Sequence, residues 1–126
     1  MQLSRMLPIR QKFPDRSIHD IPGEVNRQLR NSGFTAGLRP GAQVALGVGS
    51  RGIANIATIT RAVADFLRGE GYSPFVFPAM GSHGAATAEG QADVLAHYGI
   101  HEATMGCPVV SSLEVVSLGK IGRAHV

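Results

Sequence analysis

Two short glycine-bounded turns hold the residues of this chain that are best suited to chemistry. Residues 49–52 read Gly-Ser-Arg-Gly and residues 81–84 read Gly-Ser-His-Gly. Each turn follows a short apolar run and precedes a segment with helical spacing. In an open α/β sheet, ligands bind in the crevice beyond the carboxyl ends of the strands. The matched turns therefore predict one crevice that holds an anion site beside a titratable base.

The side chains in the turns suggest distinct roles. Arg51 offers a planar guanidinium fork that suits a carboxylate or a phosphate. His83 is the side chain best placed to accept or give a proton near neutral pH. Ser50 and Ser82 add hydroxyl donors, and a glycine-rich turn that enters a helix exposes backbone N–H groups to an anion. We predict His83 as the catalytic acid–base, with Arg51 and Ser82 binding the substrate.

A single turn of this kind is more often an ordinary connection whose side chains face water. Two turns in register, with complementary chemistry, favour the functional interpretation. Neither turn is a Walker motif or a dinucleotide-binding fingerprint. Two alternatives stay open: a non-catalytic module that binds a nucleotide or small anion, and a hydrolase that uses His83 as a general base.

Other polar candidates are weaker. His97 and His101 have a metal-ligand spacing, but a helix stop at Gly99 lies between them, so no zinc site is predicted. Cys107 has no nearby histidine, which favours a buried structural thiol. Glu89 is expected to be an exposed glutamate in the first turn of a helix.

Composition limits the class of protein. The chain has 126 residues, 44% of them hydrophobic, which is the size and character of one folded domain. No apolar stretch approaches the roughly 18 residues of a membrane span, and we expect a cytoplasmic protein with no membrane partner. The net charge is +3, but the basic residues are not interleaved with aromatic ones, so a nucleic-acid partner is not predicted.

The turns need elements to position them. Three segments carry a leucine four residues before a glycine that is followed by an apolar residue, which predicts helices over 18–32, 54–70 and 87–98. Thr87 is the predicted N-cap of the last helix. Apolar runs predict strands at 44–48 and 74–78, with weaker candidates at 108–110 and 114–118. This order predicts an α/β fold with a doubly wound, mainly parallel sheet and Rossmann-like strand–helix alternation.

Two segments together resemble the N-terminal domain of the nickel-pincer-nucleotide lactate racemase family. They are residues 48–56 (Val-Gly-Ser-Arg-Gly-Ile-Ala-Asn-Ile) and 78–91 (Pro-Ala-Met-Gly-Ser-His-Gly-Ala-Ala-Thr-Ala-Glu-Gly-Gln). The resemblance runs over most of residues 20–120. The second motif is the more specific. Val48 stands where lactate racemases carry the aspartate of an Asp-x-Thr-Arg pattern, which favours a 2-hydroxy acid other than lactate as the substrate.

The resemblance implies an isomerase that racemises or epimerises a small-molecule 2-hydroxy acid. A nickel-pincer nucleotide takes the hydride from the carbon that bears the hydroxyl, and a histidine takes the hydroxyl proton. His83 matches one of the family's two acid–base histidines. The implied cofactor-binding loop comprises Gly49, Ser50, Arg51 and Gly52. The second histidine and the lysine that bonds the cofactor are implied to lie in a C-terminal domain of the same chain, beyond residue 120.

The last six residues suggest why that domain is missing. Residues 121–126 (Ile-Gly-Arg-Ala-His-Val) back-translate to a common sequencing-adapter oligonucleotide. We therefore expect an N-terminal extension over 1–17, a racemase-like α/β domain over 18–120 and adapter read-through over 121–126. The fragment alone is expected to be inactive, and its open sheet is expected to favour self-association.

Overall fold

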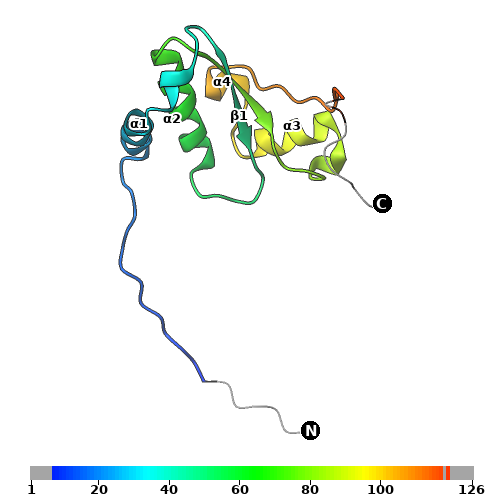
Figure 1. Cartoon of the computed structure of the whole chain (residues 1–126). Coiled ribbons are helices and arrows are strands. Elements are labelled where there is room, and N and C mark those ends of the chain that lie inside the picture. Colours follow the sequence, from blue (N-terminus) through cyan, green and yellow to red (C-terminus); the bar gives the residue numbers. More distant parts are fainter. Residues whose placement is uncertain (1–6, 118, 120–126) are drawn as a thin grey trace.

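Helices and strands alternate after an extended N-terminal segment. The computed structural model describes residues 7–117 and 119. The elements are α1 (Ile21–Ser32), η1 (Phe34–Gly37), β1 (Gln43–Val48), α2 (Ile56–Gly69), β2 (Ser73–Pro78), η2 (Gly84–Ala86), α3 (Ala88–His97) and α4 (Glu102–Met105) (Figure 1). The α/β class is therefore confirmed.

β1 and β2 form a parallel pair. The register places Val48 opposite Pro78, so the two strands end at the same level of the sheet. The weaker strand predicted at 108–110 is reduced to an isolated parallel bridge between Val76 and Val109. Over residues 114–117, the described part of the other weak candidate, the chain forms no strand. The described sheet is thus smaller than predicted.

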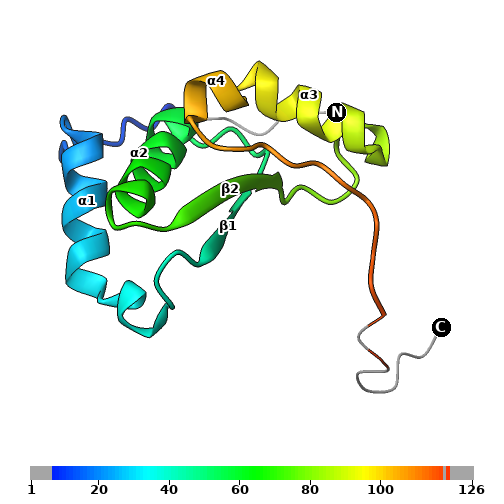
Figure 2. The same cartoon turned by 90° about the horizontal axis from the view of Figure 1, so that it is seen from above.

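The doubly wound arrangement is not confirmed. The buried core joins Val48 and Val76 of the strands to Ala64 of α2 and Leu95 of α3, so helices α2 and α3 share one face of the sheet. Figure 2 shows α3 and α4 on one side of the two strands. A doubly wound sheet needs helices on both faces. Here Phe77, on the opposite face, stays 37% exposed.

Glycines end the helices as the leucine–glycine spacing predicts. Gly71 takes a left-handed φ of 86°, and the N–H of Tyr72 donates to the Leu67 carbonyl at 2.9 Å. Gly99 ends α3 in the same way, with a 2.9 Å bond from Ile100 to Leu95. These are Schellman motifs. After α1, Gly33 is also left-handed, but the N–H of Phe34 donates to the Ser32 hydroxyl instead.

Two helices start later than predicted, α1 because of a side-chain cap and α2 because a left-handed residue precedes it. Asp20 caps α1 by accepting from the Gly23 N–H at 2.9 Å, so α1 begins at Ile21 and not at residue 18. Helix α2 begins at Ile56, after Asn55 has taken a left-handed conformation. Residues 121–126, interpreted as adapter read-through, lie outside the described part of the chain.

A short helix, α4, had no sequence prediction. Arginines of α2 hold its C-terminal end: Arg61 donates to the carbonyl of Thr104, and Arg68 donates to the carbonyl of Gly106 at 2.8 Å. Asp65 pairs with both arginines and keeps them in place. Among the described residues, no helix combines the length and apolar character needed to cross a bilayer.

Candidate functional site

The two predicted turns meet at the ends of the parallel strands. The Ser50 hydroxyl and Nδ1 of His83 are hydrogen-bonded across the gap between the loops. Because β1 and β2 end in register, the residues that follow each strand leave the sheet side by side. The N–H of Ala79 also donates to the Val48 carbonyl at 2.8 Å. The predicted crevice therefore exists, and it contains a Ser–His pair.

A cleft of about 330 Å³ opens between the loops. It is lined by Gly49, Ser50, Arg51, Ile53, Ala79, Met80, Gly81 and His83. Of the predicted site residues, Ser82 and Gly52 belong to the same turns but do not line the cleft. The cleft thus brings together a guanidinium, an imidazole and a hydroxyl, with apolar side chains beside them.

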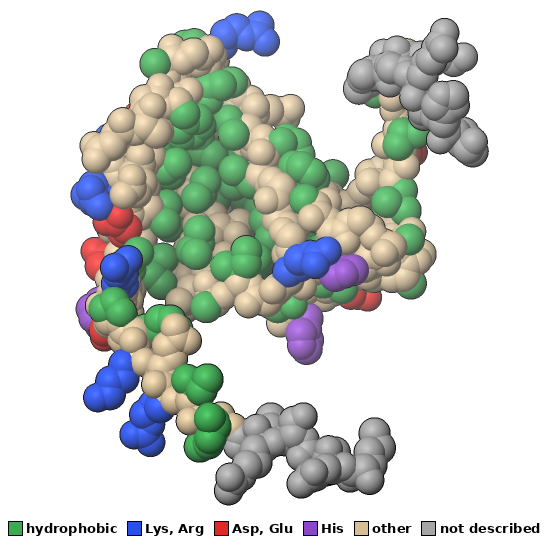
Figure 3. All heavy atoms as spheres, turned by 60° about the horizontal axis from the view of Figure 1, so that its bottom comes forward, with side chains coloured by type: hydrophobic (Ala, Val, Ile, Leu, Met, Phe, Trp, Pro, Cys, Tyr) green, Lys and Arg blue, Asp and Glu red, His purple; other side chains and the backbone are tan. Residues whose placement is uncertain are grey.

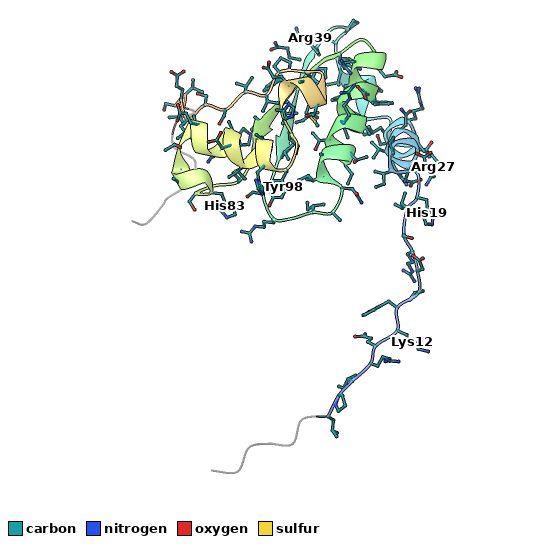
Figure 4. All side chains as sticks on the ribbon, turned by 180° about the vertical axis from the view of Figure 1, so that it is seen from behind. Lys12, His19, Arg27, Arg39, His83 and Tyr98 are labelled. Carbon is teal, nitrogen blue, oxygen red and sulfur yellow. The ribbon has the colours of Figure 1, made fainter. Side chains whose placement is uncertain are left out.

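Among the described residues, one side chain from outside the two turns forms a hydrogen bond with the first loop. The Tyr98 hydroxyl, just after α3, donates to the Ser50 carbonyl at 3.1 Å. Figure 4 shows Tyr98 and His83 as neighbours at one end of the molecule. Tyr98 is half-buried, so its hydroxyl is fixed by the packing of its ring. This bond fixes the backbone of the residue that contacts His83.

The second loop is held more firmly, by α3 itself. The buried Gln91 donates its side-chain amide to the Gly81 carbonyl at 2.7 Å. Gly84 packs directly on Gly90: a Cβ at Gly84 would lie 2.3 Å from the Gly90 carbonyl carbon. Thr87 caps α3 as predicted, accepting from the Gly90 N–H at 3.0 Å. His83 therefore projects from a loop that is braced against the first turn of α3.

A left-handed turn follows His83. Gly84, Ala85 and Ala86 have φ values of 63°, 56° and 54°. Left-handed backbone is common for glycine, but it costs an alanine about 1–2 kcal/mol. Strained backbone of this kind tends to occur at functional sites, where the surrounding structure holds it. The sequence carries no signal for it beyond Gly84.

The predicted use of helix N-termini does not hold. Helix α2 begins at Ile56, after the intervening residues 52–55, and α3 begins at Ala88, after the left-handed turn. The positive end of a helix dipole acts only within about one turn. Among the residues that line the cleft, Arg51 is therefore the main source of positive charge for an anion.

The Ser–His contact allows two chemical arrangements, which differ in the tautomer of the imidazole. If Nδ1–H donates to Ser50, Nε2 of His83 is a free acceptor and the histidine acts as a base toward a ligand. If Ser50 donates to Nδ1, the hydroxyl is activated as a nucleophile. Both arrangements place the reacting ligand in the cleft beside Arg51.

The remaining polar candidates behave as structural residues. No group of three histidine, cysteine or acidic side chains gathers as a metal site within residues 7–117 and 119. His101 precedes α4, on the far side of the Gly99 stop from His97. Burial raises the pKa of the Cys107 thiol, and the residue is 8% exposed, in line with a structural role.

Sequence reasoning missed the Ser50–His83 contact and the two side chains that hold the loops, Gln91 of α3 and Tyr98 just after it. The available signal was that Ser50 and His83 follow closely, by two and five residues, the ends of two strands predicted to be adjacent, but the register was unknown. Tyr98 and Gln91 carry no motif, because a single donor to a backbone carbonyl leaves no pattern in the sequence.

Comparisons of this chain with protein-family models, with curated proteins and with solved structures find no match. The resemblance to nickel-pincer-nucleotide racemases therefore stays a prediction that rests on the two motifs.

Proposed function

We propose that this chain supplies the acid–base histidine and the anion clamp of an enzyme that racemises or epimerises a small 2-hydroxy acid. The observation that carries the proposal is the Ser50–His83 hydrogen bond inside a cleft that Arg51 also lines. A 2-hydroxy acid has a carboxylate next to a hydroxyl-bearing carbon. The guanidinium and the imidazole suit these two groups respectively.

In this proposal each side chain acts on a different part of the substrate or of the catalytic histidine. Arg51 binds the substrate carboxylate and fixes the orientation of the molecule. Nε2 of His83 accepts the proton of the substrate hydroxyl and holds it while the carbon that bears this oxygen is at the keto level, and it returns the proton to the oxygen when the carbon is reduced again. Ser50 is a positioning residue: by accepting from Nδ1–H it leaves Nε2 unprotonated and facing the substrate.

The polar groups that line the cleft suit the phosphate of a nickel-pincer nucleotide better than they suit its nickel ion. The Arg51 guanidinium, the Ser50 hydroxyl and the glycine-rich backbone of residues 49–52 are suitable phosphate donors. When bound, such a nucleotide supplies the hydride acceptor. Lys12 is the lysine within the described part of the chain, and it lies in the N-terminal segment, so the tethering lysine belongs in the proposal to a C-terminal domain. A cytoplasmic location is assumed, where the buried thiol of Cys107 stays reduced.

Ligand binding tests the anion clamp on the 126-residue chain itself. Lactate and nicotinic acid mononucleotide are titrated separately while the NMR signals of His83 and the Arg51 side chain are followed. We expect saturable shifts that Arg51→Gln abolishes. Arg39→Gln is the matched control, because Figure 4 shows Arg39 far from His83. A wild-type chain that shows no saturable shift at tens of millimolar ligand contradicts the clamp.

Turnover tests the acid–base role and needs the longer, nickel-loaded protein that the resemblance implies. Racemisation of 2-hydroxy acids is followed in D₂O. Hydride return predicts inversion without deuterium at C2. His83→Gln is expected to lower kcat about 10²–10⁴-fold, the usual contribution of positioned proton transfer. Deuterium incorporation at C2 would exclude the hydride route.

The Ser–His contact itself favours one second candidate, a hydrolase with Ser50 as nucleophile. Ser50→Ala distinguishes the two. A hydrolase loses nearly all activity and no longer reacts with a fluorophosphonate probe, whereas a racemase retains part of its activity because His83 remains. The non-catalytic module is indicated if the wild-type protein binds the ligand without any turnover and His83→Gln leaves this binding unchanged.

A further inference from the structure

One face of the sheet carries apolar side chains that no described helix covers. Ala45 pairs with Phe75 and Gly47 with Phe77 in the parallel register, so these residues share a face. Phe77 lies over Gly47, where a Cβ would come within 3.0 Å of its ring, and Phe75 packs beside it at 6.5 Å between ring centroids. Figure 3 shows hydrophobic side chains gathered in a broad patch on this side of the molecule. We call these four residues the open face.

The extended N-terminal segment has apolar side chains that are also uncovered. Leu7, Ile9 and Phe13 are 83%, 91% and 75% exposed. Side chains at even spacing point to the same side of an extended chain, so these three form one apolar edge. Basic Arg10 and Lys12 lie on the opposite edge. Residues 7–13 are thus an amphipathic extended strip, which we call the arm.

We propose that the arm of one copy of this chain docks on the open face of a second copy, which gives a dimer by reciprocal exchange. When two copies exchange identical segments, the same contact forms twice and covers the open face of each copy. The apolar edge of the arm packs on Phe75 and Phe77, and the basic edge faces water. This inference does not depend on the proposed function, because the open face and the cleft use different residues.

The direction of the arm favours a second copy over the same chain. In Figure 1 the arm leads away from α1 and from its own sheet. Reciprocal docking takes Leu7, Ile9 and Phe13 of both copies out of water, together with the exposed part of Phe77, so the same apolar surface is buried twice. An isolated monomer would leave both apolar surfaces in water.

The first test is the oligomeric state of the whole chain by sedimentation over a range of concentrations. We expect a reversible dimer. Ile9→Asp places a charge in the interface and should raise the dimer dissociation constant at least tenfold. Val115→Asp is the matched control: Val115 is also 91% exposed but lies outside the arm, so the variant should dimerise like the wild type. Both positions are exposed, so neither change disturbs the fold.

The second test distinguishes exchange from folding back. A spin label is placed at Lys12→Cys, on the basic edge of the arm that faces water, since the native Cys107 is buried. Labelled chains are mixed with ¹⁵N-labelled chains that carry no spin label. Broadening of the Phe75 and Phe77 amides in the ¹⁵N chains supports the exchange. A monomer at every concentration, a dimer that Ile9→Asp leaves intact, or a dimer whose ¹⁵N chains show no broadening at Phe75 and Phe77 overturns it.

Discussion

The two loops that form the cleft start from equivalent places but are held very differently. The second loop is held by a buried glutamine, by glycine-on-glycine packing and by the cap of α3. The first loop depends on one hydrogen bond from a half-buried tyrosine. His83 therefore lies in the firmly held loop, and Arg51 lies in the loosely held one.

This difference suits the chemistry that we propose for each side chain. A proton acceptor must be fixed to within a fraction of an ångström of its target, whereas a guanidinium can follow a carboxylate and still form its hydrogen bonds. The strained turn after His83 fits the same division, since backbone strain persists only where neighbours hold it. Helix α3 and the tyrosine that follows it, Tyr98, contact the two loops and so set the spacing between His83 and Arg51.

The largest expected difference between the loops is at their glycines. Gly84→Ala should destabilise the chain by about 3 kcal/mol, because the new Cβ meets the Gly90 backbone and the φ of 63° disfavours alanine. Gly52→Ala has a similar φ of 66° but open space, so about 1 kcal/mol is expected. Urea unfolding measures both. Equal losses would show that the second loop is no better braced than the first.

The second-largest difference in stability is expected between variants of the two side chains that anchor the loops, Gln91 and Tyr98. Gln91→Leu leaves the Gly81 carbonyl without its partner and should cost about 1–2 kcal/mol. Tyr98→Phe removes one hydrogen bond near solvent and should cost about 0.5–1 kcal/mol. Hydrogen exchange shows where each change acts. Faster exchange at the His83 amide is expected from Gln91→Leu alone, and the same effect from Tyr98→Phe would contradict the separate anchoring of the loops.

The smallest difference concerns backbone strain. Ala86→Gly relieves a left-handed alanine, and after the entropy that glycine gains in the unfolded chain it should stabilise by about 0.5 kcal/mol. Asn55→Gly changes a left-handed residue in the first loop, but asparagine tolerates that conformation, so no gain is expected. Thermal unfolding of the two variants gives the comparison. A destabilised Ala86→Gly would mean that the turn carries no strain.

Local sequence patterns predicted the parts of the fold that depend on neighbours along the chain. The Leu67–Gly71 and Leu95–Gly99 spacings fixed two helix ends because the Schellman motif uses only adjacent residues. The same logic failed for α4, whose last turn is held by arginines of α2 more than thirty residues away. The same reasoning predicted too large a sheet. An apolar run such as 114–118 favours a strand but does not say which strand it would pair with.

The site was predictable to a similar extent. The cleft, with Arg51 and His83 in it, follows from the position of each turn after a parallel strand. The Ser50–His83 bond needs the register, which the sequence does not contain. Ser82 was predicted to bind the substrate as a hydroxyl donor of the second turn, yet it does not line the cleft.

The in-register ending of β1 and β2 makes this site sensitive to strand length in a way that its loops are not. Inserting or deleting one residue within β2 would turn its side chains to the opposite face and shift His83 by about 3.3 Å relative to Ser50. Changes of length at residues 52–55 leave the strands and the Ser–His pair in place. Insertions and deletions are therefore expected to be tolerated in the first loop beyond Arg51, where they can alter the size of the ligand that fits. Within either strand they are expected to abolish the site.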